Sequence, residues 1–238
     1  MSTLFDIEHV PFSRQGRFLT LSMMKVPGEE GARALYLRFV AGGDERPSLG
    51  RLCRMEFFDG AGRPATPTFE LTPEQLVVRV GDGQVAFVIG EGERLHLRGG
   101  KAGVRFHLEG SRYDYVYRTP QGEQCLVAAV ENVKFIPRAA AGTLEVTGAW
   151  QRDHSEKVSF AFSGEIFEAS VDFFRTVPPQ DRPGSFADAL AGASANFSTW
   201  HAGMGERLAS QGEAHRLASY LLWANGVPAR RPPTPPAD

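Results

Sequence analysis

Apolar and polar residues alternate with a period of two from residue 17 to residue 177, in short runs separated by turn residues. Glycine-containing pairs such as Asp59-Gly60 and Gln121-Gly122 supply the positive backbone angles that tight turns need. No helical period interrupts this stretch. The candidate strands are Arg17–Val26, Ala34–Ala41, Arg51–Asp59, Thr68–Leu71, Gln75–Val80, Val85–Gly90, Arg94–Leu97, Val104–Leu108, Tyr113–Arg118, Cys125–Val130, Lys134–Pro137, Thr143–Gln151, Lys157–Ser163 and Ile166–Thr176.

The number of candidate strands is larger than a small β-sandwich contains. They predict a mostly β fold in which residues 1–177 form a large two-sheet antiparallel β-sandwich. A closed barrel is the alternative that the pattern leaves open.

The pattern changes after Val177. Residues 178–184 read as a linker, and Ser185 can cap the helix that follows. Residues 185–229 then predict a short helical segment with two helices, and residues 230–238 a disordered proline-rich tail. The apolar stripe of the first helix is Phe186, Leu190, Phe197 and Trp200, and that of the second is Leu217, Tyr220, Leu221 and Ala224. Trp223 lies beside the second stripe, so we expect it to be partly exposed.

Composition narrows the class of protein. The net charge is -2 without a basic block, so we expect neither nucleic acid nor a membrane surface as a partner. The N-terminus lacks the features of a signal peptide, and no apolar run has the length of a membrane span. We therefore expect a cytoplasmic protein. In that compartment Cys53 and Cys125 should be buried thiols that form no disulfide.

Catalytic and metal-binding motifs are missing from the sequence, so we expect no cofactor and no metal. His96 and His107 would face each other if their strands formed a hairpin, an arrangement that favours an ordinary surface pair over a metal site. Hydrolysis of a glycosidic bond commonly uses two carboxylates. Glu165, Glu168 and Asp172 lie close in sequence, but we interpret them as solvated surface carboxylates.

One strand carries a candidate binding surface. Alternation over Ser111–Arg118 places Tyr113, Tyr115 and Tyr117 on one face. Three exposed tyrosine rings could stack on the apolar faces of sugar rings, whereas a core stripe is the ordinary role of tyrosine in a strand. Core packing is the favoured interpretation, and the sugar platform remains the alternative.

The segments Ile7–Ser22, Leu35–Arg38 and Ala218–Pro228 resemble the front end of bacterial glycoside hydrolases with a six-hairpin (α/α)6 barrel, the relatives of processing α-glucosidases, trehalases and mannosylglycerate hydrolases. In that family a β-sandwich precedes linker helices and then the barrel. The resemblance implies that this chain corresponds to the N-terminal sandwich and the first barrel helix. The acid and base carboxylates would lie in the barrel, beyond Asp238, so no catalytic residue is assigned here.

We therefore expect a non-catalytic N-terminal domain of a glucosidase-like glycoside hydrolase, inactive by itself, that supports a barrel in which the oligosaccharide or glycoside substrate is bound. The alternative is an independent carbohydrate-binding or assembly module. The helix over residues 206–225 could also mediate self-association through an exposed apolar face.

Overall fold

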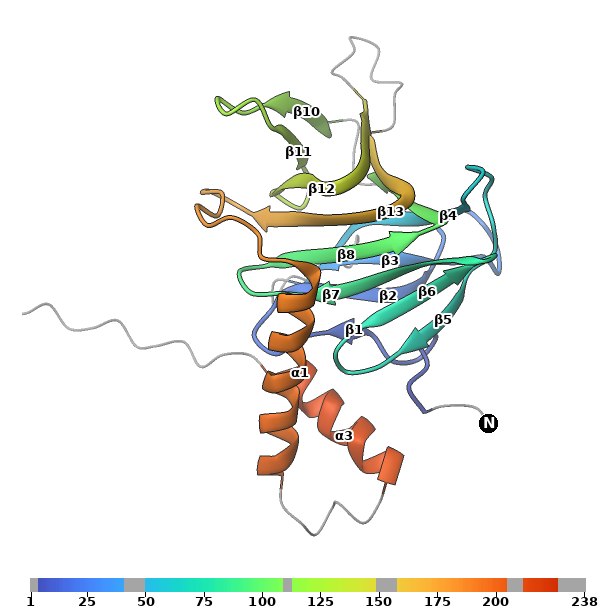
Figure 1. The fold of residues 1–238 in the computed structure, drawn as a ribbon, viewed down its shortest axis with the longest axis vertical. Helices are drawn as coiled ribbons and strands as arrows, with labels where there is room; N and C mark the ends of the chain where they lie inside the picture. The colour runs from blue at the N-terminus through green and yellow to red at the C-terminus, as the bar shows by residue number, and fades with distance from the viewer. Residues whose placement is uncertain (1–3, 41–49, 109–112, 149–157, 205–211, 227–238) are drawn as a thin grey trace, which may run out of the picture.

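The structure is a computed structural model, which describes residues 4–40, 50–108, 113–148, 158–204 and 212–226. These residues form a 13-stranded antiparallel sheet followed by two helices (Figure 1). The mostly β fold with C-terminal helices, predicted from the sequence, is confirmed. The strands are β1 (Phe12–Ser13), β2 (Leu19–Lys25), β3 (Arg33–Phe39), β4 (Arg51–Asp59), β5 (Thr68–Leu71), β6 (Leu76–Val80), β7 (Gly83–Ile89), β8 (Arg94–Gly100), β9 (Ala102–Leu108), β10 (Tyr115–Arg118), β11 (Gln124–Ala128), β12 (Val133–Thr147) and β13 (Ser159–Phe174), and the helices are α1 (Phe186–Gly203) and α3 (Gly212–Ala224).

Long bent strands form the centre of the sheet. β8 and β9 are consecutive parts of one strand, because both pair with β13 in the same register, Leu97 opposite Ala169 and Phe106 opposite Phe160. On its other side β13 pairs with β12 over nearly its whole length. The expected hairpin between Arg94–Leu97 and Val104–Leu108 is therefore wrong. His96 and His107 lie in different halves of the bent strand and do not face each other.

Glycine allows these strands to bend sharply. A side chain on Gly99 would come within 2.5 Å of the Phe167 ring, and one on Gly103 within 2.2 Å of the Phe58 ring. On β12, Gly142 takes a positive φ of +82° at the second of two register shifts. Such bulges and glycines let a strand turn from one layer of a sheet into the next. The sequence pattern divided each of β12 and β13 into two candidate strands, because local alternation does not show that a bent strand continues.

The bend folds the sheet into two facing layers. Beyond it β9 is followed by β4, β3, β2 and β1, and β8 by β7, β6 and β5. Phe57 on β4 meets Phe87 on β7 edge to face, with ring centroids 6.3 Å apart. Their side chains belong to one large buried core. The two layers are thus parts of one hydrogen-bonded sheet, with the core between them. The short edge strand β1 was not predicted.

Helix α1 covers the outer face of the β7 layer. Ser185 caps it as expected, with its side chain accepting a hydrogen bond from the amide of Asp188 and the Asp188 side chain bonding back. Phe186 and Ala193 pack on Ala86 and Val88. Residues 178–184 lead into the helix and lie against the sheet, where they line a pocket described below.

The buried side of α3 differs from the prediction. Tyr220 and Trp223 are both 0% exposed, whereas Leu221 is 37% exposed. The helix has two neighbours: Trp223 donates a hydrogen bond to Asn196 of α1, and Tyr220 packs against Phe5. Because α3 packs against two neighbours, its predicted apolar stripe does not include all of its buried residues. The expectation that Trp223 is partly exposed is wrong. The domain boundaries stay predictions, and residues 230–238 lie outside the described residues.

Candidate functional site

The predicted tyrosine surface is only partly built on a strand. Tyr115 and Tyr117 share one face of β10, with ring centroids 6.1 Å apart and ring planes inclined by 38°. Tyr113 precedes the strand in a turn and is 52% exposed. Between the two strand tyrosines, Val116 points to the other face and packs against the core. The three rings are near one another in sequence, but they do not form one flat strand surface. Their contact with sugars stays a prediction.

The hydroxyl of Tyr117 and the thiol of Cys125 form a hydrogen-bonded pair. Tyr117 lies opposite Cys125 on β11, and the hydrogen bond between them, with burial, raises the pKa of Tyr117 to about 12. Burial likewise raises the pKa of the Cys125 thiol. Both groups therefore stay protonated near neutral pH. Cys53 and Cys125 are both buried and form no disulfide, as predicted.

A buried ion cluster lies between the sheet and the linker. Asp172 on β13 is 0% exposed and accepts hydrogen bonds from Arg94 on β8 and Arg138 on β12. Arg94 also pairs with Asp181 of the linker at 3.0 Å, and Arg138 with Glu123 at 2.6 Å. The interpretation of Asp172 as a surface carboxylate is therefore wrong. Buried charges need such partners, because desolvation otherwise makes them costly.

The pKa values of the cluster follow from these pairs. Burial alone would lower the pKa of Arg94, but its hydrogen bonds and attraction to Asp172 and Asp181 outweigh that effect and raise it. The pKa of Arg138 is raised for the same reason, by Glu123 and Asp172. The hydrogen bond from Arg94 lowers the pKa of Asp181. These shifts favour the charged forms of Arg94, Arg138 and Asp181, and the Arg94–Asp181 pair fastens the linker to the sheet.

Beside this cluster is a pocket of 750 Å³, here called the linker pocket. Small residues of β12 and β13 line one part of it and Pro178–Gly184 another. Its carboxylates already have partners: Glu123 accepts from Arg138, and Glu168 accepts from the amide of Phe186 at 2.9 Å. Glu165, by contrast, is exposed, as predicted. The pocket offers polar contacts to a ligand, but its carboxylates are bound to the protein and are not presented as a catalytic pair.

His96 lies next to the cluster in an environment that opposes protonation. It is 4% exposed on β8, opposite Val88 and Ser170. Burial, followed by the positive charge of Arg94, lowers its pKa from 6.5 to about 4. The imidazole is therefore neutral at neutral pH.

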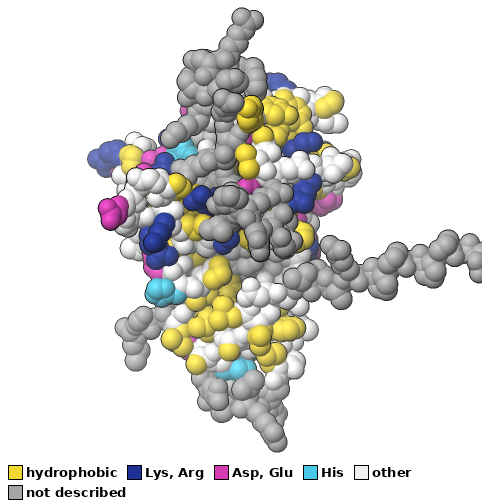
Figure 2. Space-filling view, turned by 180° about the vertical axis from the view of Figure 1, so that it is seen from behind, with side chains coloured by type: hydrophobic (Ala, Val, Ile, Leu, Met, Phe, Trp, Pro, Cys, Tyr) yellow, Lys and Arg dark blue, Asp and Glu magenta, His cyan; other side chains and the backbone are white. Residues whose placement is uncertain are grey.

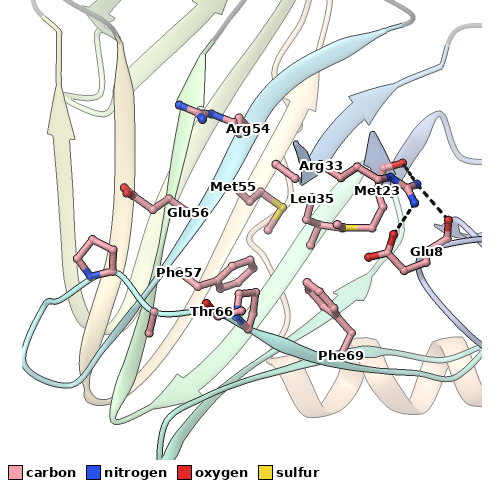
Figure 3. A pocket seen from close by; sticks show the side chains of 14 residues that line it. Glu8, Met23, Arg33, Leu35, Arg54, Met55, Glu56, Phe57, Thr66 and Phe69 are labelled. Atoms are coloured by element: carbon pink, nitrogen blue, oxygen red, sulfur yellow. Dashed lines mark hydrogen bonds and ion pairs between the residues drawn. The ribbon is translucent and has the colours of Figure 1, made fainter. Parts of the chain in front are cut away.

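A second cavity, here called the wedge pocket, opens between β3 and β4 and measures 580 Å³ (Figure 3). The two strands pair only over Tyr36–Arg38 and then separate. The loop after β4 folds back onto the edge of that strand, where the amide of Ala65 donates to the carbonyl of Phe57 at 3.1 Å. The space between β3 and this loop reaches the core. No sequence motif marks it, because it arises from the pairing of strands.

Sequence reasoning missed Asp172 and both of its arginines. A signal was present: Asp172 stands in the run Val171-Asp-Phe-Phe174, and a charged residue among large apolar ones is rarely left without a buried partner. The partners themselves come from strands distant in sequence, and only the sheet order brings them together.

Among the residues that the structure describes, no group of three or more histidine, cysteine, aspartate or glutamate side chains is arranged to hold a metal ion. Nor does this part of the chain contain a helix with the length and apolar character needed to cross a membrane. No protein-family model matches the chain. No curated protein matches it either.

Proposed function

We propose that this chain is the non-catalytic β-rich domain of a glucosidase-like glycoside hydrolase and that its helical end supports a helical (α/α)6 catalytic barrel. The order of elements agrees with this proposal, since a large antiparallel sheet precedes two helices. The resemblance of residues 7–22, 35–38 and 218–228 supports it independently of the fold.

The observation that carries the proposal is the way α3 is built. One side of the helix is anchored by buried polar contacts: the Tyr220 hydroxyl accepts from the amide of Ser13 and donates to the carbonyl of Pro11, each at 2.8 Å. From α1, Trp200 donates to the carbonyl of Ser219 at 3.1 Å. A helix held this firmly on one side can serve as a rigid base for further structure on its other side.

The other side of α3 is apolar. Leu222 is 58% exposed, and Leu221 lines a groove of 280 Å³ together with Phe18 and Val40, which are 40% and 42% exposed. We call Phe18, Val40, Leu221 and Leu222 the helical-end patch. Figure 2 shows hydrophobic side chains gathered over this end of the molecule. Clusters of exposed apolar side chains mark interaction surfaces, and a helical domain continuing the α1–α3 pair is the occupant that we propose.

The arrangement of the carboxylates supports the non-catalytic part of the proposal. Glycoside hydrolysis needs an acid and a base held on either side of the scissile bond. In the linker pocket the carboxylates of Glu123 and Asp181 are bound by arginines, and that of Glu168 by a backbone amide. These groups stabilise the sheet and the linker.

The direct test is hydrolysis of 4-nitrophenyl α-glucoside by the purified chain. We expect no release of nitrophenol above that of a heat-treated sample. Release that is lost on Glu123→Gln or Glu168→Gln would overturn the proposal, because it would place a catalytic carboxylate in this chain. Glu165→Gln, at an exposed position, is the matched control.

A second candidate is an independent carbohydrate-binding module. The neighbouring rings of Tyr115 and Tyr117 favour it, because aromatic pairs on a surface can stack against sugar rings. Calorimetric titration with α-gluco-oligosaccharides tests this candidate. Binding that weakens in Tyr113→Ala and Tyr115→Ala would support it, whereas no heat of binding at millimolar sugar would leave only the supporting role. We also propose a cytoplasmic location, because no apolar run of the sequence has the length of a membrane span.

A further inference from the structure

The wedge pocket has a deep apolar interior. Leu35, Met55 and Phe57 line it and are each 5% exposed or less, so its inner wall is part of the main core. Met23 and Phe69 are partly buried and complete the walls from β2 and β5. Protein cores are close-packed, and openings of several hundred Å³ that reach buried side chains are typical of ligand sites.

The shape of the pocket suits a flat ring. Figure 3 shows Phe57 and Phe69 extending from different strands toward the same space, beneath Leu35 and the two methionine side chains. Aromatic rings favour offset or edge-on contact with other rings. Thioether sulfur, supplied here by Met23 and Met55, also packs well at the edge of an aromatic ring and adapts to its outline.

Three of the four charged side chains that line the pocket, those of Glu8, Arg33 and Glu56, form ion pairs within the protein. Arg33 pairs with Glu8 at 2.5 Å and also donates to the carbonyls of Glu8 and Met23 at 3.2 Å. Glu56 is bound by His107 at 3.1 Å, with Arg105 at 3.7 Å. A charged ligand would have to compete with these pairs, whereas an uncharged one would not.

From this combination we infer that the wedge pocket binds an uncharged aromatic small molecule, with its ring between Phe57 and Phe69. The polar rim offers hydrogen bonds to one edge of such a molecule. The inference is independent of the supporting role proposed above, because the wedge pocket and the helical-end patch share no residue.

The test uses the full chain and N-phenyl-1-naphthylamine, an uncharged aromatic probe whose fluorescence rises in apolar surroundings. We expect saturable binding at one site. Ala65→Phe fills the pocket and should weaken binding by about 10-fold or more, while Phe69→Ala removes one wall and should weaken it about 5-fold. Ala61→Phe is the control, because Ala61 is exposed in the same loop and does not line the pocket.

Thermal unfolding of each variant shows whether it is folded, and Phe69→Ala carries the test if Ala65→Phe is not. Absence of saturable binding to the folded wild-type chain would overturn the inference. Equal weakening by Ala65→Phe and Ala61→Phe would also overturn it, because the probe would then bind elsewhere. Neither result bears on the hydrolysis test.

Discussion

Asp172 shows how a single residue can link distant parts of this molecule. Its buried carboxylate forms ion pairs with Arg94 of β8 and Arg138 of β12. Arg94 in turn forms an ion pair with Asp181 in the linker. Period-two alternation predicted the strand that carries Asp172, but not the burial of this residue, because its two arginine partners come from strands distant in sequence. Composition and spacing carry no information about such partners.

Replacing Asp172 should therefore be costly. In Asp172→Asn the two arginines lose their shared negative partner while they remain half-buried or buried, so we expect the free energy of unfolding to fall by roughly 3 kcal/mol. Glu165→Gln, at an exposed position on the same strand, should change it by less than about 0.5 kcal/mol. Urea unfolding measures both. Equal small effects would mean that the cluster contributes little to stability.

The buried His96 makes stability depend on pH. Its pKa is about 4 in the folded chain and near 6.5 when unfolded, so between these values the unfolded state binds more protons. This contribution is complete above pH 6.5 and is lost as the pH falls toward 4, by at most about 3 kcal/mol. The melting temperature of His96→Asn should consequently fall less over this range than that of the wild type. The exposed control His9→Asn should follow the wild type. Parallel curves for all three would contradict the assignment.

At the scale of elements, most of the strands could be predicted, and the connections between the long ones could not. The candidates Arg51–Asp59 and Thr68–Leu71 agree with β4 and β5 to the residue. The pattern failed at the bend, where Gly99-Gly100 has the composition of a turn but ends β8 next to β9, and where Gly142 lies within β12. Local sequence does not distinguish a glycine that ends a strand from one that bends it, since the difference depends on the neighbouring strand. The wedge pocket was not predicted for a different reason, because it arises where β3 and β4 stop pairing and separate.

The bend gives a test of this interpretation. Gly142→Ala would place a Cβ 2.4 Å from that of Phe167 at a φ of +82°, so both crowding and backbone strain oppose it. We expect a loss of more than about 3 kcal/mol. Gly28 has nearly the same φ, +79°, but nothing within 4 Å, so Gly28→Ala should lose only about 1 kcal/mol. Both substitutions add backbone strain, and only Gly142→Ala adds crowding. The difference between their free energies of unfolding, measured with denaturant, therefore gives the cost of crowding. Similar losses would show that the bend is not tightly packed.

At the scale of the whole molecule, the folded sheet and the helices have different structural roles. The sheet supplies the core, the ion cluster fastens the linker, and Tyr220 and Trp223 anchor α3. What remains on the outside of the helical end is the helical-end patch. The sequence predicted that α3 would leave an apolar face exposed, but it placed Trp223 there, and the structure puts Leu221 and Leu222 there. The second contact of α3, with the N-terminal segment, could not be deduced from the helix alone.

The central claim is that the helical end is an apolar docking surface that should also favour self-association of the purified chain, and sedimentation velocity over a range of protein concentrations tests it most directly. If the patch favours association, the wild-type chain should sediment faster as its concentration rises, and Leu222→Asp should reduce this effect. Ile166→Asp, at a 70% exposed apolar residue on β13, should leave it unchanged. A wild-type chain that stays monomeric at every concentration, or equal effects of the two substitutions, would contradict the claim.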